Sequence, residues 1–259
     1  MNNPLSPYKV SQEIQLKNDN VDVWCVSLEV DKSCLSSFHQ SLSEDERMKA
    51  NRMRFKNKRD YYVAARGLLR LIIAAYLKEK PERLGFQYGP HGKPELAKEF
   101  IGTGLTFNMS HSHGLAVYGV GHKRVLGVDI EKIRSDMSFT KIAKRFFSPL
   151  EFETLQKLPA EQQKQGFFKC WTRKEAYIKA IGQGLFFPLN RFDVSLVPGK
   201  PAALIEDRTD PRQASRWSIV NLDVDPNYAA ALVVEGKEIT VSVNVPSRET
   251  SFLPSVTFN

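Results

Sequence analysis

The chain has 259 residues, and its 37 Lys and Arg against 29 Asp and Glu give a formal net charge of +8. Hydrophobic residues at 42% and charged residues at 25% are ordinary for a globular domain and exclude a disordered or fibrous chain. Residues 1–15 lack the apolar core of a signal peptide. The most apolar run, residues 68–77, contains Arg70 and is too short to span a bilayer. We therefore expect a cytoplasmic protein.

The three cysteines, at positions 25, 34 and 170, show no zinc-binding or redox spacing, which predicts reduced, structural thiols. The excess of Lys and Arg over Asp and Glu favours an anionic partner: nucleic acid, an anionic membrane, a ligand with several phosphates, or an acidic protein. Lys and Arg are concentrated in residues 47–59. This segment is interpreted either as the solvated face of a helix or as a phosphate-binding edge.

In the first half of the chain, residues 21–28 alternate in the manner of a strand. Ser43, followed three residues later by Glu46, forms a capping-box pattern that predicts the start of a helix. A second helix is expected over residues 60–78, with Arg66 and Arg70 one turn apart. Two strands are predicted next, at residues 104–110 and 115–120.

The second half repeats this order of elements. Ser148, Pro149 and Glu151 combine an N-cap, a proline at the first helical position and a capping box, which predicts a helix start. A longer helix is expected over residues 167–181, ended by glycines at positions 182 and 184. The predicted strands of this half are residues 125–130, 192–197, 217–222 and 229–234.

The order of a strand, then helices, then further strands occurs twice. This repeat predicts an α+β fold of two similar α/β halves in a pseudo-twofold arrangement. An active site is expected in the cleft between the halves. The expected units are residues 1–124, residues 125–235, and residues 236–259, which comprise an extra strand at 239–245 and a loose tail.

Two motifs suggest metal-dependent phosphate chemistry. Residues 127–131 (GVDIE) place Asp129 and Glu131 on one face of a strand, where the two carboxylates repel each other unless they are neutralised. Residues 171–179 (WTRKEAYIK) place Glu175 and Lys179 on one face of a helix. Each motif alone also fits an ordinary surface, as an exposed edge strand or an exposed ion pair. Together, three carboxylates and a lysine suit Mg²⁺ holding a phosphate ester.

Two further clusters carry candidate ligand contacts. Residues 107–113 (FNMSHSH) contain His111, which could bind a phosphate or stack on a base. His111 and His113 could also suggest a metal, but no third nitrogen or sulfur ligand is near in sequence. Residues 89–94 (GPHGKP) form a turn that presents Lys93, which is also consistent with an ordinary surface lysine. No P-loop, GxGxxG, GxSxG or HExxH motif is present.

The motifs, taken in order, resemble those of the 4′-phosphopantetheinyl transferases. The matching segments are GKP at 92–94, FNMSHS at 107–112, GVDIE at 127–131, FFS at 146–148 and WTRKEAYIK at 171–179. The length and the two-half organisation are similar to the monomeric, surfactin-synthetase-activating (Sfp) type rather than to the half-length trimeric type. The resemblance extends from about residue 43 to about residue 234.

The resemblance implies a Mg²⁺-dependent holo-[acyl-carrier-protein] synthase, which transfers 4′-phosphopantetheine from coenzyme A to a carrier-protein serine and releases adenosine 3′,5′-bisphosphate. It also implies that Asp129, Glu131 and Glu175 bind Mg²⁺. Glu175 or a metal-bound water would deprotonate the serine, and Lys179 would neutralise the departing phosphate, so that the implied catalytic set is Asp129, Glu175 and Lys179. The implied coenzyme A contacts are Arg47, Lys49, Arg66, Lys93, Ser110, His111 and Lys179.

The implied partners are coenzyme A and an apo acyl or peptidyl carrier protein of fatty acid, polyketide or nonribosomal peptide biosynthesis. Carrier proteins are typically acidic, which suits a basic transferase. We expect no nucleic-acid or membrane partner. Two alternatives remain open: a Mg²⁺-dependent nuclease or phosphodiesterase, and a non-catalytic module that binds coenzyme A or a carrier. His113 has no role in the resemblance.

Overall fold

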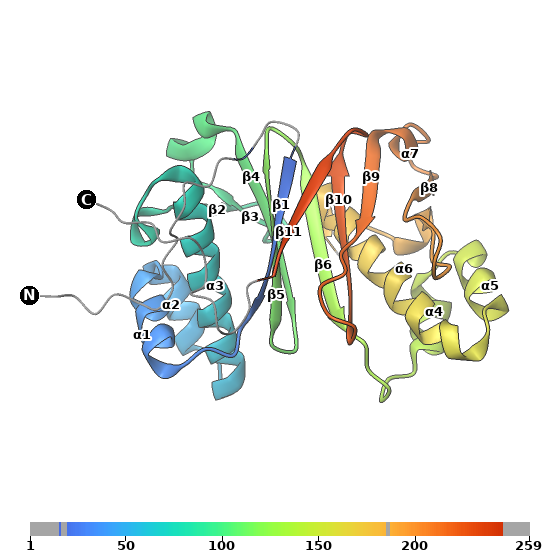
Figure 1. Ribbon diagram of the computed structural model, residues 1–259, viewed down its shortest axis with the longest axis horizontal. Helices are drawn as coiled ribbons and strands as arrows, with labels where there is room; N and C mark the ends of the chain where they lie inside the picture. The colour runs from blue at the N-terminus through green and yellow to red at the C-terminus, as the bar shows by residue number, and fades with distance from the viewer. Residues whose placement is uncertain (1–15, 17–19, 185–186, 246–259) are drawn as a thin grey trace, which may run out of the picture.

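The computed structural model describes residue 16, residues 20–184 and residues 187–245. Figure 1 shows helices on the two outer sides and β-sheets in the middle. None of the helices in these ranges combines the length and the apolar character needed to cross a membrane.

The first half forms an antiparallel sheet covered by three helices. Its elements are β1 (Asn20–Ser27), α1 (Lys32–Ser41), α2 (Glu44–Asn51), α3 (Lys56–Leu77), η1 (Pro81–Arg83), β2 (Phe86–Tyr88), β3 (Pro94–Leu96), η2 (Lys98–Thr103), β4 (Leu105–Ser112) and β5 (Leu115–His122). β5 lies between β1 and β4 and is antiparallel to both. β11 (Thr240–Asn244) returns to this sheet and pairs with β1 in parallel.

The second half has the same topology. Its elements are β6 (Leu126–Lys132), α4 (Phe139–Phe146), α5 (Pro149–Lys157), α6 (Ala160–Ala180), η4 (Leu189–Arg191), β7 (Phe192–Val194), β8 (Leu204–Asp207), α7 (Gln213–Arg216), β9 (Trp217–Asn221) and β10 (Tyr228–Glu235). β10 lies between β6 and β9, so the order β6-β10-β9 repeats β1-β5-β4. This repeat confirms the predicted α+β class with two similar halves.

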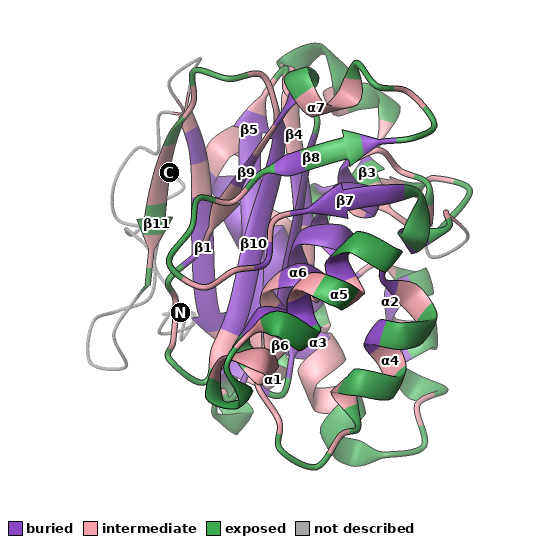
Figure 2. Ribbon diagram, turned by 90° about the vertical axis from the view of Figure 1, so that its right-hand side faces the viewer, coloured by how far each residue is buried: buried purple, intermediate pink, exposed green. Residues whose placement is uncertain are grey.

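Three apolar clusters hold the layers together. One lies between the first sheet and α1 to α3, and a second lies between the second sheet and α4 to α6. The third is built from both sheets, with Val23 of β1, Val128 of β6 and Leu232 of β10 among its members. Figure 2 shows the resulting burial: β10 is buried along its length, whereas α4 and α5 each expose a face. The central strands β5 and β10 are buried on both faces except at their ends, as a layer between two others requires.

Most element predictions are confirmed, with shifted ends. Both capping boxes are present, at the starts of α2 and α5. The strand expected at 239–245 is β11, while residues 246–259 lie outside the described residues. α6 was expected to begin at residue 167 and begins instead at Ala160. The additional turns consist largely of Glu, Gln, Lys and Ala, which are good helix formers without a strong apolar pattern.

Gly127 allows α6 to approach β6 closely. A Cβ at this position would lie 2.2 Å from the carbonyl oxygen of Ala176 and 2.5 Å from the nitrogen of Ala180. Both are backbone atoms of α6, so no side-chain rotation could relieve the overlap. A glycine here therefore determines how near α6 lies to the strand that carries Asp129.

We expect Gly127→Ala to lower the free energy of unfolding by about 3 kcal/mol or more, because the added methyl group must push a helix backbone away from its strand. Equilibrium urea unfolding measures this loss. Gly102→Ala is the control: a Cβ there meets nothing within 4 Å, and its cost should be below about 0.5 kcal/mol. Equal losses for the two variants would contradict the proposed close approach.

Candidate active site

The site forms where the edge strands of the two sheets meet. Side chains of β4 bridge to β6: Asn108 Oδ1 accepts a hydrogen bond from Val128 N at 2.9 Å. Two residues further along β4, Ser110 Oγ donates to Asp129 Oδ1 at 2.8 Å. Alternate residues of a strand share a face, so this row of side chains follows directly from the β4 backbone. The two halves are thus joined at the site by polar side chains.

Asp129 lies at the centre of these contacts. The residue is 3% exposed, and its Oδ1 is 2.6 Å from Lys179 Nζ. Lys179 Nζ also donates to Ser110 Oγ at 2.9 Å and to Val128 O at 3.2 Å. An ammonium has three donors, and all three are used here. By contrast, Asp129 Oδ2 is buried and has no hydrogen-bond partner among the described residues.

Glu175 does not form the exposed ion pair with Lys179 that its spacing also allowed. The residue is 9% exposed, and its Oε1 is buried without a hydrogen-bond partner in the described part of the chain. Burial, and then the Asp129 carboxylate, raise the pKa of Glu175 to about 7, with Lys179 acting in the opposite direction and Glu131 adding to the rise. A buried carboxyl group next to other carboxylates favours its neutral form.

The rotation of α6, and hence the direction of Glu175, is fixed by the preceding residue. Lys174 is fully buried, 2.8 Å from Glu151 Oε2, and it donates to the carbonyl oxygens of Leu189 and Phe192. Glu151 in turn accepts from the backbone nitrogens of Ser148 and Val194. A buried ion pair persists when its remaining hydrogen bonds are satisfied, as they are here.

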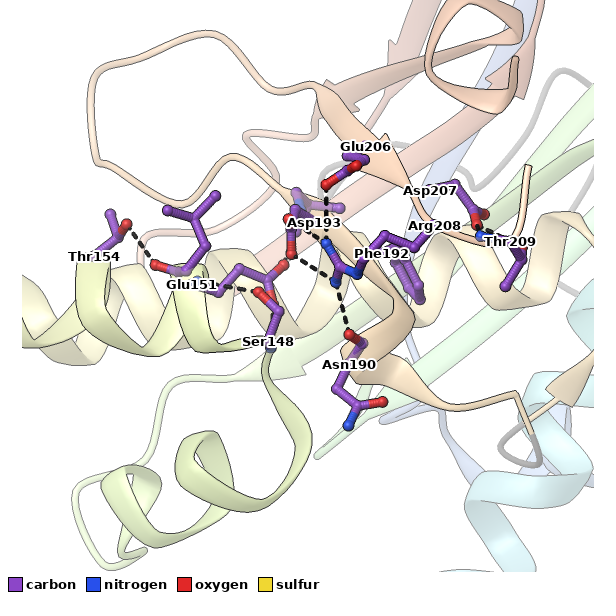
Figure 3. Close-up of polar contacts among 12 residues, drawn as sticks. Ser148, Glu151, Thr154, Asn190, Phe192, Asp193, Glu206, Asp207, Arg208 and Thr209 are labelled. Atoms are coloured by element: carbon purple, nitrogen blue, oxygen red, sulfur yellow. Dashed lines mark hydrogen bonds and ion pairs between the residues drawn. The ribbon is translucent and has the colours of Figure 1, made fainter. Parts of the chain in front are cut away.

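Figure 3 shows how the hairpin beside this network is held. Arg208 donates to Asp193 at 2.7 Å, to Glu206 at 3.1 Å and to the carbonyl oxygen of Asn190 at 2.7 Å. Asp193 lies on β7, directly after the Phe192 carbonyl that binds Lys174. These contacts therefore support the backbone against which α6 is oriented.

Glu131 is the third expected metal ligand and lies on the same face of β6 as Asp129. Its Oε2 accepts a hydrogen bond from Ser112 Oγ at 2.8 Å. Burial and the Asp129 carboxylate raise the pKa of Glu131, while the Ser112 hydrogen bond and Lys179 lower it. Ser112 was not among the predicted site residues.

Lys93 contacts the end of α6 and the start of β6. Its Nζ donates to the carbonyl oxygen of Lys179 at 2.8 Å and to that of Leu126 at 3.2 Å. Burial lowers the pKa of Lys93 against the opposing effect of Glu95. These two bonds tie the β2–β3 hairpin to the end of α6 and to the start of β6, and the ammonium's third donor has no hydrogen-bond partner among the described residues.

His111 lies on the face of β4 opposite to Ser110, because successive side chains of a strand alternate. Met109, on the same face as His111, packs against the core beneath α3. His111 is solvent accessible, yet the protein around its ring and then the Lys179 ammonium lower its pKa. The neutral ring is thereby favoured.

Arg47, Lys49 and Arg66, the predicted basic contacts of the first half, each interact with another part of the protein. Arg66 is 5% exposed and donates through Nε to Glu46 Oε1 at 2.6 Å, while Arg70 donates to the other oxygen of Glu46 at 2.7 Å. Arg66 therefore has a structural partner that the basic pattern did not predict. On α2, Arg47 donates to the carbonyl oxygen of Leu42, and Lys49 lies 5.4 Å above the ring of Tyr62.

The carboxylates fit a divalent cation by their chemistry. As the side chains stand, no three His, Cys, Asp or Glu residues in the described ranges are grouped to hold a metal ion. Lys179 and Ser110 both bind Asp129 Oδ1. However, Asp129 and Glu175 each have one buried oxygen to which no described residue is hydrogen-bonded. Hard cations such as Mg²⁺ prefer such carboxylate oxygens, so the donor chemistry of Asp129 and Glu175 suits a divalent cation.

Comparison with known proteins gives consistent matches. The family model described as the 4′-phosphopantetheinyl transferase superfamily matches residues 125–233, and the one described as 4′-phosphopantetheinyl transferase, N-terminal, matches residues 29–122. The 4′-phosphopantetheinyl transferase HetI of Nostoc sp. is 40% identical over 223 residues, which is 86% of this chain and 91% of the relative. The 4′-phosphopantetheinyl transferase of Bacillus subtilis is 35% identical over 158 residues, 60% of this chain and 67% of the relative.

Among solved structures, the holo-[acyl-carrier-protein] synthase of Thermotoga maritima aligns with a TM-score of 0.32 and 20% identity. The alignment covers 44% of this chain and 64% of that chain.

The raised pKa of Glu175 predicts a pH-dependent stability. Between its ordinary value of 4.5 and about 7, the carboxyl is protonated in the folded chain but ionised in the unfolded chain. The folded state then binds more protons, so the free energy of unfolding falls as pH rises through this window. Glu175→Gln removes the effect and should stabilise the metal-free protein at pH 8 by up to about 3 kcal/mol, with little gain at pH 4.5.

Urea unfolding in EDTA at the two pH values measures this difference. Glu153→Gln is the control, because Glu153 is exposed and Lys157 lowers its pKa, so that no gain at pH 8 is expected. If Glu175→Gln raises the free energy of unfolding equally at both pH values, Glu175 does not titrate between them.

Proposed function

Because this chain belongs to the 4′-phosphopantetheinyl transferase superfamily, we propose that it transfers 4′-phosphopantetheine from coenzyme A to a serine hydroxyl of an apo carrier protein, as a Mg²⁺-dependent monomer. The observation that carries the proposal is the meeting of Asp129, Glu175 and Lys179 at the junction of the two halves, where two buried carboxylate oxygens have no partner in the described part of the chain. Adenosine 3′,5′-bisphosphate is the leaving product.

In this proposal Asp129, Glu131 and Glu175 hold Mg²⁺. The bound cation would supply charge neutralisation to the pyrophosphate of coenzyme A. Phosphoryl-type transfer depends mainly on positioning and on charge stabilisation, for which a carboxylate-held cation and a lysine are suitable groups.

Glu175 is the proposed general base. The carrier serine Oγ attacks the phosphorus next to the pantetheine arm, its proton passes to Glu175, and the bond from that phosphorus to the bridging oxygen breaks in favour of the nucleotide. A base must be ionised to accept a proton; without a metal, burial and the Asp129 carboxylate raise the pKa of Glu175 to about 7. Binding of a cation next to Glu175 would lower this value.

Lys179 is proposed to neutralise the departing phosphate. Its three donors are engaged by Ser110, Asp129 and Val128, so a phosphate oxygen must replace one of these acceptors. Lys93, Ser110 and His111 are the proposed contacts to the nucleotide end of coenzyme A, since Lys93 and Ser110 contact the Lys179 region directly. Arg47, Lys49 and Arg66 remain proposed contacts that rest on the resemblance alone.

The test of the reaction is the intact mass of several acidic apo-carrier proteins after incubation with this protein, coenzyme A and Mg²⁺. We expect a gain of one phosphopantetheine, abolished by EDTA. Glu175→Gln should reduce kcat/KM at least about 100-fold, because it removes the base, whereas Glu153→Gln on exposed α5 should retain transfer.

Different negative results of these assays would reject different parts of the proposal. No mass gain with any carrier would reject the transferase, and DNA cleavage by the same sample would identify a nuclease. Retained carrier affinity in Asp129→Ala, together with no turnover by the unmodified protein, would indicate a binding module. Near-normal turnover of Glu175→Gln would exclude Glu175 as the base.

His111→Ala should weaken binding of coenzyme A about tenfold but leave that of dephospho-coenzyme A nearly unchanged, since a hydrogen bond to a charged phosphate contributes about 1.5–3 kcal/mol. Isothermal titration with both ligands measures this. The control is His122→Ala, at the far end of the β4–β5 pair, opposite Leu105. Equal losses for both ligands would rule out the 3′-phosphate contact.

A further inference from the structure

His113 has no part in the proposed transfer, yet its backbone is held in an uncommon conformation. Its φ is 44°, in the left-handed region that residues other than glycine seldom adopt. The hydroxyl of Tyr228, on β10 of the second half, donates to the His113 carbonyl oxygen at 2.7 Å. A contact from the opposite half thus holds this turn directly after β4.

The hydrogen bonds of Ser112 link His113 to Glu131. Ser112 Oγ is 3.0 Å from His113 Nδ1 and 2.8 Å from Glu131 Oε2, and it accepts a hydrogen bond from the backbone nitrogen of Lys132 at 3.3 Å. A hydroxyl has one proton and two acceptor sites. An ionised Glu131 can only accept, so Ser112 donates to Glu131 and accepts from His113 Nδ1–H. One arrangement of protons satisfies all three contacts.

This arrangement controls the direction of the Glu131 side chain. Among the described residues, Ser112 is the one group hydrogen-bonded to the Glu131 carboxylate. Glu131 is only partly buried and has three rotatable side-chain bonds, so without Ser112 several rotamers would be accessible. Partners behind a metal ligand fix its orientation and change metal affinity.

We propose that Ser112 and His113 are positioning residues, which form a hydrogen-bonded relay that holds Glu131 in the orientation needed to bind a divalent cation. The inference rests on the proposed function, since it assumes that Glu131 is a metal ligand. Ser112 and His113 touch neither the cation nor the substrate and act through Glu131.

The test is Mn²⁺ binding to the protein alone, without coenzyme A or carrier, followed by the electron paramagnetic resonance of free Mn²⁺. Ser112→Ala should weaken Mn²⁺ binding about 10-fold or more, because partners of metal ligands typically change affinity by that order. Ser112→Thr keeps the hydroxyl and should restore binding. Thr106→Val is the matched control: Thr106 lies on the same face of β4, and its hydroxyl donates to the carbonyl oxygens of Gly121 and Arg124, away from Glu131, so the Mn²⁺ affinity of this variant should be unchanged.

For His113 the informative variant is His113→Gly, which accepts the positive φ while removing the ring. We expect it to melt at or above the temperature of the unmodified protein and to bind Mn²⁺ several-fold more weakly. His113→Asn tolerates the same backbone and supplies an amide donor, so it should recover part of the affinity. A purely structural role would lower the melting temperature without a selective loss of Mn²⁺.

The inference is overturned if the Ser112→Ala variant binds Mn²⁺ as tightly as the unmodified protein. If the His113→Gly variant also binds Mn²⁺ with unchanged affinity, His113 is not part of the relay. If the unmodified protein modifies a carrier while Ser112→Ala binds Mn²⁺ normally, the inference alone fails. If the unmodified protein neither binds Mn²⁺ nor transfers, the proposed function fails with it.

Discussion

The buried Asp129 carboxylate beside the buried Glu175 carboxylate is the constraint around which this molecule is organised. Two negative charges in a desolvated site repel each other and disfavour ionisation, and the raised pKa of Glu175 is the direct consequence. Lys179 forms an ion pair with one oxygen of Asp129 and Ser110 donates a hydrogen bond to it, but the second oxygen of Asp129 and one of Glu175 have no partner among the described residues. Such groups lower stability and are typical of a site prepared for a charged ligand.

The fold maintains this arrangement from two sides. On one side, β4 of the first half presents Asn108, Ser110 and Ser112 to β6, so that side chains replace the backbone ladder between two edge strands. On the other side, α6 is held close by the missing side chain at Gly127 and oriented by the buried pair of Lys174 and Glu151. A movement of either half changes the distances within the site, and the junction therefore couples the positions of the halves to the chemistry.

The element order was accessible from the sequence because its signals are local. The capping boxes at Ser43 and Ser148 depend on residues three apart, and strand alternation depends on residues two apart. Both capping boxes are present in the folded chain. The boundary that failed, the start of α6 at Ala160, lies in a polar stretch where helix propensity is high and apolar periodicity is weak. Ser112 was also recoverable in principle, since it continues the alternation of Asn108 and Ser110, but the predicted strand ended at residue 110.

By itself, the sequence determined the repeated order of elements, the strand carrying Asp129 and Glu131, the helix carrying Glu175 and Lys179, and the resemblance to a family. The tertiary structure alone decided which groups meet: Lys179 with Asp129, fifty positions away, Arg66 with Glu46 rather than with solvent, and Ser112 with Glu131. The physical reason is that periodicity fixes the face on which a side chain lies but not what lies opposite it. Burial and neighbouring charge, which shift a pKa and leave an oxygen unpaired, arise when distant segments pack together.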